Sequence, residues 1–410
     1  MNFKIDSARR SVSLDPRDPL FFNDPYPAYR AIAAETPAFF WEQYGFWCFA
    51  RHAHVSSLLR DKRLGRQILH LATREELGWS EPPAHIAPFL EIERHSLLEL
   101  EPPEHARLRN LIKRAFVSRQ VERLAPRIAS LANELIDGFE GRGEVDLIEE
   151  FATRIPVVVI AELLGVPAEM WRQLLDWSHR MVAMYQFGRT RAVEDDAVAA
   201  TKAFSAFLRG YVEERRSALR DDLISQLIVA EADGGRLSEE ELITTCILLL
   251  NAGHEATVHA IGNGVKAMLA ASIDSREAFA TPAVTTALVE EMLRIDPPLH
   301  LFTRYALEDV EFADVALKKG DQIGLLLGAA NRDGDRFPDA DRIDLSRAPN
   351  PHVAFGGGIH FCVGAPLARL EMQAALPILF ARLPGLRLAA TPRYRDSYHF
   401  HGLEALPLVW

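Results

Sequence analysis

The sequence predicts a mainly α-helical protein with small β-sheets. Helical periodicity covers most of the 410 residues, whereas strand-like segments are short and confined to 46–50 and 310–327. Apolar residues make up 48% of the chain and charged residues 25%, so burial can offset the entropy of ordering a globular fold. Because no repeat, low-complexity run or flexible linker divides the chain, we expect a single domain over 1–410, with 1–23 as an N-terminal extension or loop.

Two early helices are predicted from the spacing of apolar residues. After the start signal Pro102-Pro103, apolar residues recur at helical intervals, namely Leu108, Leu111, Ile112, Ala115 and Phe116. The segment 125–139 repeats this periodicity and is followed by the stop signals Gly141 and Gly143. The segment 310–327 contains turn signals at Asp314 and Gly320, which indicates short strands.

A long apolar helix is predicted from Leu242 to about Leu269. Ser238 and Glu241 form a capping-box signature before it. The helix is apolar on nearly every face, which is typical of a buried helix, but residues 251–257 interrupt it with polar groups. Buried polar groups need partners. One interpretation is that these groups form an internal hydrogen-bond network. The other is that the helix crosses a cofactor or substrate cavity, where Gly253 permits close approach.

His254, Glu255 and His259 on this helix superficially resemble a zinc motif. That motif needs two histidines four residues apart, on one helix face. Here the histidines are five apart and diverge by roughly 140° around the helix. We therefore expect no zinc site of that kind.

Charge and hydropathy exclude several functional classes. The chain has 46 Lys and Arg against 57 Asp and Glu, a net charge of −11, and no basic stripe that could neutralise a run of phosphates. No segment approaches the ~20 apolar residues of a membrane helix, and residues 1–19 lack the apolar core of a secretory signal. Three scattered cysteines indicate no disulfide framework. We expect a cytoplasmic protein that binds neither nucleic acid nor membrane.

The densest chemical signal is the segment 355–369, Phe-Gly-Gly-Gly-Ile-His-Phe-Cys-Val-Gly-Ala-Pro-Leu-Ala-Arg. A lone cysteine is more often a small apolar residue than a ligand. Here, however, glycines surround Cys362, and they let backbone N–H groups and a flat ligand approach closely. A thiolate at this position would be stabilised by those N–H groups, by the start of the following helix and by a metal.

With these residues the sequence resembles the cytochrome P450 family of haem-thiolate monooxygenases. The family's cysteine loop is matched at Phe355, Gly358, His360, Cys362 and Gly364. Three further motifs follow the family's order: the oxygen-binding segment 252–255 (Ala-Gly-His-Glu), the Glu-x-x-Arg pair of Glu291 and Arg294, and the stretch 337–342, which ends in Arg342. The resemblance spans roughly residue 24 to the C-terminus and implies the cytochrome P450 fold, with a long central helix over a haem.

The resemblance also implies a role for each residue. The cofactor is haem b (iron protoporphyrin IX), and Cys362 is its iron ligand, whose thiolate favours O–O cleavage. Phe355 shields the sulfur and Ala252 lies at the haem. Partners of the haem propionates are His105, Arg109, Arg304 and His360, each of which could instead be a surface charge. Glu291, Arg294 and Arg342 form a buried structural ion network.

The central helix departs from the family at one catalytic position. The family places a threonine directly after the acid, but here Ala256 follows Glu255 and the threonine is Thr257. One residue is about 100° of rotation, so Thr257 cannot simply substitute. Either water and a polar group of the substrate complete a proton relay from Glu255, or a helix distortion brings Thr257 into play. A third interpretation is that Ala256 reflects packing and the enzyme is poorly coupled.

The expected function is insertion of one oxygen atom into a small, mostly apolar molecule, with hydroxylation foremost. No nicotinamide or flavin fingerprint occurs, so the resemblance implies a ferredoxin with its reductase as electron donor to a monomer.

A basic docking patch would comprise Arg109, Lys113, Arg114 and Arg369, although these residues also suit a solvated helix face. Expected substrate contacts are Leu248, Asn251, Leu299, His300, Phe302, Phe400 and His401, where the histidines could equally be structural. The alternatives are a peroxide-using or rearranging haem enzyme and a non-catalytic haem- or ligand-binding protein.

Overall fold

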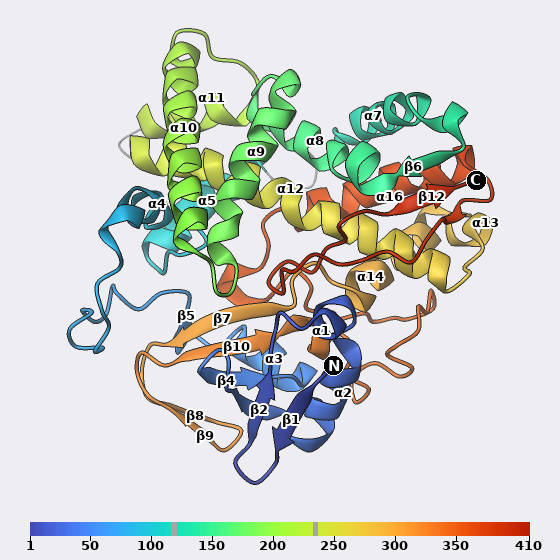
Figure 1. The fold of residues 1–410 in the computed structure, drawn as a ribbon. Helices are drawn as coiled ribbons and strands as arrows, with labels where there is room; N and C mark the ends of the chain where they lie inside the picture. Colours follow the sequence, from blue (N-terminus) through green and yellow to red (C-terminus); the bar gives the residue numbers. More distant parts are fainter. Residues whose placement is uncertain (116–120, 233–236) are drawn as a thin grey trace. The chain divides into compact units, whose positions relative to one another are not determined.

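A computed structural model describes residues 1–115, 121–232 and 237–410 and confirms the mainly α-helical class with small sheets (Figure 1). The contacts divide the chain into two compact units. Unit 1 comprises Met1–Ile68, Ala125–Ala152 and Ala256–Trp410, and unit 2 comprises Leu69–Leu124 and Thr153–Glu255. The single domain over 1–410 stays a prediction. No helix in the described parts of the chain is both long and apolar enough to cross a membrane.

The strands that the described residues form all lie in unit 1. They are β1 (Phe3–Asp6), β2 (Ser11–Leu14), β3 (Ala38–Trp41), β4 (Phe46–Phe49), β5 (Leu64–Gly65), β6 (Glu144–Asp146), β7 (Leu301–Ala306), β8 (Val310–Phe312), β9 (Val315–Leu317), β10 (Gln322–Leu326), β11 (Arg387–Leu388) and β12 (Pro407–Val409). Seven of them form one sheet in the order β1-β2-β3-β4-β10-β7-β5. In this sheet β10 pairs in parallel with β4 and antiparallel with β7, so orange strands lie among blue ones (Figure 1).

The N-terminal residues are not the loop that the sequence predicts. β1 and β2 form an antiparallel hairpin with Phe3 opposite Leu14, and β2 continues the sheet by pairing with β3. Val12 and Leu14 are fully buried, whereas the serines between and beside them are not. This alternation buries one face of the hairpin, so residues 1–23 belong to the folded unit.

The strands predicted at 46–50 and 310–327 are confirmed as β4 and as β8, β9 and β10. The predicted turns are present as well: Asp314 and Gly320 both have positive φ, 58° and 95°. β7 and β3 were not predicted, because the sequence signal for such short strands is weak without their partners.

The helices of unit 1 are α1 (Pro19–Asn23), α2 (Tyr26–Glu35), α3 (His52–Leu58), α7 (Ala125–Asp137), α13 (Ser275–Ala278), α14 (Pro282–Ile295), α15 (Leu327–Ala330) and α16 (Ala365–Arg382), with a π-helical turn at Ile148–Ala152 and 3₁₀ turns at Glu140–Arg142 and Gly358–His360. The predicted helix at 125–139 is therefore confirmed as α7. α16 packs against α7 and α14.

Unit 2 is helical. It contains α4 (Ala87–Glu93), α5 (Glu104–Ala115), α8 (Arg154–Leu164), α9 (Trp171–Val182), α10 (Arg191–Arg216) and α11 (Leu223–Ala232), with 3₁₀ turns at Ala84–Ile86, Ala168–Met170 and Ala183–Tyr185. α10 packs along α9 and α4, and α8 packs on α9. The predicted early helix is confirmed as α5, although Phe116 lies outside the described residues.

The long helix α12 (Glu239–Ala270) contributes its first part to unit 2 and its second to unit 1. Its predicted capping box is confirmed: the Ser238 backbone N–H donates to Glu241 Oε2 at 2.8 Å, and the Glu241 N–H donates to Ser238 Oγ at 3.2 Å. The reciprocal bonds satisfy two helix N–H groups that have no partner within the helix, and so fix where α12 begins.

Candidate functional site

The cysteine loop of unit 1 is a tight turn that leads into α16. The Cys362 N–H donates to the Phe355 carbonyl at 3.0 Å, which ties the two ends of the loop together. Gly358 has a φ of +68°, and an added Cβ there would clash with the carbonyl oxygen of Leu59, so only glycine fits. An added Cβ at Gly364 would lie 3.9 Å from Cys362 Sγ, which places this glycine directly beside the sulfur.

The donor at this loop fits the haem-thiolate ligand that the sequence predicts. Cys362 is exposed, and so are the apolar side chains of Ile359 and Phe361 beside it. A sulfur donor among apolar side chains and glycines suits a flat apolar cofactor with a soft metal ligand. Cys48 and Cys246, in contrast, are buried, and burial raises the pKa of the Cys246 thiol to about 12 and that of Cys48 well above its usual value.

Ion pairs hold the start of α16 against α14. The Arg369 Nε lies 2.6 Å from Glu290 Oε1, and the guanidinium stacks over the Phe355 ring at 4.5 Å. His352 Nε2 lies 3.0 Å from the other oxygen of Glu290. Burial raises the pKa of Glu290, but the bonds from Arg369 and His352 outweigh it and lower that pKa to about 2. Arg369 is therefore engaged within unit 1, while the side chain of Arg114, also expected in the docking patch, lies outside the described residues.

Glu291 and Arg294 on α14 form the buried pair that the sequence predicts. Their side chains are 1% and 0% exposed, and Arg294 Nε lies 2.6 Å from Glu291 Oε1. The other donors of Arg294 bond to the carbonyls of Asn331, Ala340 and Arg342 at 2.7–3.0 Å. This one guanidinium thereby ties α14 to the loop that precedes the cysteine.

The third side chain of the network is Arg347, and the prediction of Arg342 was wrong. Arg347 Nε lies 3.1 Å from Glu291 Oε1, while Arg342 is exposed and offers only its carbonyl. The turn closed by Arg342 N–H to Asp339 O directs the Arg342 carbonyl at Arg294, and the chain then brings Arg347 to the carboxylate. Two arginines five residues apart could not be distinguished by spacing alone.

The middle of α12 has one accessible face. Leu248, Ala252 and Ala256, each four residues apart and so on one face, are exposed or partly exposed. His254, Glu255 and Thr257 are buried. The helix is α-helical throughout 251–257, so the distortion that would bring Thr257 to the position of Ala256 is not present.

Gly253 lies where α12 meets α8 in unit 2. An added Cβ would lie 2.7 Å from Ile160 Cγ1, so the close approach that the sequence predicts is that of a neighbouring helix. Asn251, one turn earlier and partly buried, places its amide nitrogen 3.8 Å from the sulfur of Met181. Both contacts belong to packing within unit 2.

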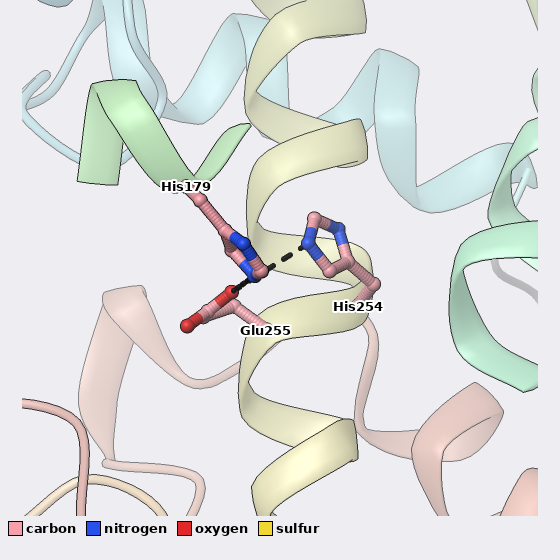
Figure 2. A group of neighbouring side chains, drawn as sticks. All are labelled: His179, His254 and Glu255. Carbon is pink, nitrogen blue, oxygen red and sulfur yellow. Dashed lines mark ion pairs between the residues drawn. The ribbon is translucent and has the colours of Figure 1, made fainter. Parts of the chain in front are cut away.

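The acid of the predicted oxygen-binding segment has two histidine neighbours (Figure 2). Glu255 Oε2 lies 3.2 Å from Nε2 of His179 on α9 and 3.6 Å from Nε2 of His254. The His179 side chain is 41% exposed and that of Glu255 only 7%, so His179 connects the buried carboxylate to solvent. His179 is not predicted from the sequence, because nothing near position 179 marks it as a neighbour of residue 255.

The predicted propionate partners have different surroundings. His105 on α5 is buried and Arg109 on the next turn is partly exposed, while Lys113, expected only in the docking patch, is exposed. Arg304 on β7 is 2% exposed and lies over the Phe302 ring at 4.8 Å, and its Nη1 donates to the Thr303 carbonyl at 3.0 Å. His360 in the cysteine loop is partly exposed.

His300 and His401 lie in a buried cluster of unit 1 around Asp296. His401 Nε2 lies 3.3 Å and His300 Nε2 3.8 Å from Asp296 Oδ1, and Tyr26 Oη donates to that oxygen at 2.6 Å. Tyr394 donates to Asp296 Oδ2 and stacks on the His401 ring. These contacts favour the structural alternative for both histidines.

Of the other expected substrate contacts in unit 1, Leu299 and Phe400 are brought together. They form an isolated antiparallel β-bridge, although they are a hundred residues apart in the sequence. Phe302 is partly buried, with the Arg66 guanidinium 4.5 Å from its ring centroid.

The Asp296 cluster predicts a loss of stability in mild acid. Burial, and then the charge of His401, lower the pKa of His300 to about 3, and burial lowers that of His399 to about 4. Between these values and 6.5 the unfolded chain binds protons that the folded chain excludes, so stability falls as pH drops below 6.5. For His300 alone we expect a loss of about 1.3 kcal/mol between pH 7.0 and pH 5.5.

Urea unfolding at pH 7.0 and 5.5 measures this loss. His300→Gln removes the titrating ring, so the difference between the two pH values should shrink in that variant. Equal stability of the wild type at both pH values would contradict the prediction.

Comparisons with known proteins agree with the geometry. A family model described as cytochrome P450 matches residues 276–383. The chain is 40% identical to cytochrome P450 107B1 of Saccharopolyspora erythraea over 368 residues, and this alignment covers 88% of each chain. It is 39% identical to the vitamin D(3) 25-hydroxylase of Pseudonocardia autotrophica, over 95% of this chain and 94% of the relative.

Solved structures show the same fold. The chain is similar to P450BioI, solved in complex with hexadec-9Z-enoic acid ligated acyl carrier protein, with a TM-score of 0.88 and 32% identity over 95% of this chain and 100% of that one. It is also similar to an epothilone B-bound cytochrome P450epoK, with a TM-score of 0.88 and 29% identity over 97% and 99% of the two chains. With 40% identity over most of its length, the chain belongs to the cytochrome P450 family, oxidoreductases that bind haem through a cysteine thiolate and act as monooxygenases.

Proposed function

We propose that this cytochrome P450 inserts one oxygen atom from O₂ into a small, mostly apolar organic substrate, foremost as a hydroxylation, with electrons from a ferredoxin and its reductase. The observation that carries the proposal is the accessible apolar face of α12, with Leu248, Ala252 and Ala256, directly beside the buried acid Glu255. An apolar surface with one polar group suits an apolar ligand and a site of proton transfer.

The relatives support an apolar substrate. One is named a vitamin D(3) 25-hydroxylase and another a mycinamicin IV hydroxylase/epoxidase. Solved structures of similar proteins hold myristic acid or testosterone. Vitamin D(3), myristic acid and testosterone are largely hydrocarbon, so we propose the same class for this chain, contacted by Leu248, Asn251, Leu299, Phe302 and Phe400.

For haem b, we propose Cys362 as the iron ligand, held by the loop of Phe355, Gly358 and Gly364. When bound through a thiolate, haem supplies the cleavage of the O–O bond. The exposed sulfur among glycines supports this assignment, as does the exclusion of the other two cysteines by burial. Further contacts proposed from the family pattern are Ala252, His105, Arg109, Arg304 and His360.

Glu255 is the proposed proton donor to the reaction. It contacts half-exposed His179, which can exchange protons with solvent. Because Ala256 presents no hydroxyl on the accessible face and Thr257 is buried, we propose that water or a polar group of the substrate completes the relay.

Thr257→Ala tests this relay. We expect the product formed per reduced cofactor consumed to stay within about twofold of the wild type, whereas Glu255→Gln should lower turnover by about 10²-fold, the usual effect of losing a positioned proton donor. Ala256→Thr, which places a hydroxyl on the accessible face, should raise the product yield. A large loss of coupling in Thr257→Ala would show that Thr257 acts directly.

The overall function is tested with the holoenzyme and a panel of apolar molecules. Steroids, macrolides and fatty acids are titrated while the haem spectrum reports displacement of water, and those that bind are assayed for product. We expect turnover with a ferredoxin, its reductase and O₂. Equal turnover with peroxide alone would favour the peroxide-using alternative, and binding without product under either condition would favour a non-catalytic binder.

A further inference from the structure

Two histidines and a glutamate of unit 2 converge on one point. The ligand atoms of His179, His254 and Glu255 all lie within 4.8 Å of one another (Figure 2). The three side chains come from two helices, α9 and α12, so the fold and not a local motif brings them together. The histidine pair of the sequence motif, His254 with His259, does not form this group.

The distances match a zinc coordination sphere. Zn²⁺ binds imidazole nitrogen at about 2.0–2.1 Å and carboxylate oxygen at about 2.0–2.2 Å, so neighbouring ligands of a tetrahedral site lie about 3.4 Å apart. Glu255 Oε2 lies 3.2 Å from Nε2 of His179 and 3.6 Å from Nε2 of His254. The two distances from the Glu255 oxygen to the histidine nitrogens therefore already match those between neighbouring ligands of one zinc ion.

The orientation of His254 is fixed as in a metal ligand. Its Nδ1 lies 2.6 Å from the carbonyl oxygen of Leu250, so Nδ1 carries the proton and donates it to that carbonyl. Nε2, the nitrogen turned toward Glu255, then carries the lone pair. Metal-binding histidines almost always donate their second N–H to a carbonyl or carboxylate in this way.

Burial and access also suit a bound cation. His254 and Glu255 are 2% and 7% exposed and form the inner side of the group, while the 41% exposed His179 brings its outer side to solvent, which would supply the cation and a water as fourth ligand. Two imidazoles and one carboxylate are a ligand set typical of zinc.

The second group of this composition in the described residues lacks these features. Asp296, His300 and His401 are all buried, and the carboxylate of Asp296 already accepts hydrogen bonds from Tyr26 and Tyr394. Because all three side chains are buried and each oxygen of the carboxylate already accepts a tyrosine hydroxyl, that cluster carries no metal proposal.

We propose that His179, His254 and Glu255 form a binding site for Zn²⁺, and that the bound cation inhibits turnover by holding the carboxylate of Glu255. Metal coordination takes the lone pair of the oxygen that would otherwise carry a proton. The inhibition rests on the proposed role of Glu255, whereas the binding site does not.

Binding is tested by calorimetric titration of the holoenzyme with Zn²⁺, with Mg²⁺ as a hard-ion control. We expect one equivalent of Zn²⁺ to bind and Mg²⁺ not to bind. Because even changes in the outer shell weaken metal sites by 10–100-fold, His179→Ala should raise the Kd by at least about 100-fold. His179 is half-exposed, so this variant keeps the fold.

The matched control is His85→Ala. His85 Nε2 lies 2.7 Å from Glu194 Oε2, which makes a His–Glu pair in the same unit to which no other described residue adds a third ligand. Its loss should leave the Kd unchanged. Absence of Zn²⁺ binding, or equal affinity in wild type and His179→Ala, would overturn the proposed site.

Inhibition is tested by adding Zn²⁺ to the reconstituted system and then removing it with a chelator. Turnover of the wild type should fall and recover, while that of His179→Ala should not respond, which also excludes an effect of zinc on the reductase. Binding at the site without inhibition would leave the site in place and contradict the proposed role of Glu255.

Discussion

Cys362→Ser should lose the red-shifted absorption of the ferrous–CO complex and all measurable monooxygenase turnover. The red shift requires sulfur coordination, and serine replaces the thiolate with a weakly acidic hydroxyl of similar size. The loop itself should survive, because Gly358 and the bond from the residue 362 N–H to the Phe355 carbonyl do not depend on the sulfur. The CO difference spectrum of the reduced protein measures the effect.

The other two cysteines provide matched controls. Cys246 is buried on α12, and burial raises the pKa of its thiol to about 12, so it stays protonated at neutral pH and cannot act as a thiolate ligand. Cys48 on β4 is likewise buried, with its sulfur packed against Gly324. Cys246→Ala and Cys48→Ala should keep the red-shifted band. A red-shifted band in Cys362→Ser would contradict the assignment of the ligand.

Features written in a short stretch of sequence could be predicted. The cysteine loop, the capping box of α12 and the turns at Asp314 and Gly320 each depend on residues within a few positions of one another. The hairpin of β1 and β2 was missed because its alternation of apolar and polar residues indicates a strand only when β3 is known to lie beside it. Strand pairing between distant segments has no local signature.

The same limit explains the errors at the site. Glu291 and Arg294 are three residues apart on one helix, so their pairing follows from helix geometry. Arg347 reaches Glu291 from a loop whose path no periodicity describes, so the motif predicts Arg342 instead. His179 meets Glu255 only through the packing of α9. Partners that depend on tertiary structure were thus the ones missed.

The second large effect is expected at the buried network. Arg294→Ala leaves the Glu291 carboxylate buried without its main partner and strips hydrogen bonds from the carbonyls of Asn331 and Ala340. Breaking a buried ion pair in this way costs about 3–5 kcal/mol. Because the same contacts hold the loop that precedes the cysteine, we expect the variant to accumulate as apoprotein. The ratio of haem to protein after purification measures the outcome.

Two further arginine variants distinguish the effect of breaking the buried network from the effect of simply removing a positive charge. Arg347→Ala removes one charged hydrogen bond from Glu291 and should destabilise the fold by about 1.5–3 kcal/mol, with partial haem loss. Arg342→Ala removes an exposed side chain and keeps the carbonyl that Arg294 uses, so the change in unfolding free energy should stay within about 0.5 kcal/mol. Haem occupancy should therefore be highest in Arg342→Ala, lower in Arg347→Ala and lowest in Arg294→Ala. Full haem occupancy in Arg294→Ala would contradict the role of the buried pair, and a larger loss in Arg342→Ala than in Arg347→Ala would show that the side chain of position 342 supports the haem loop.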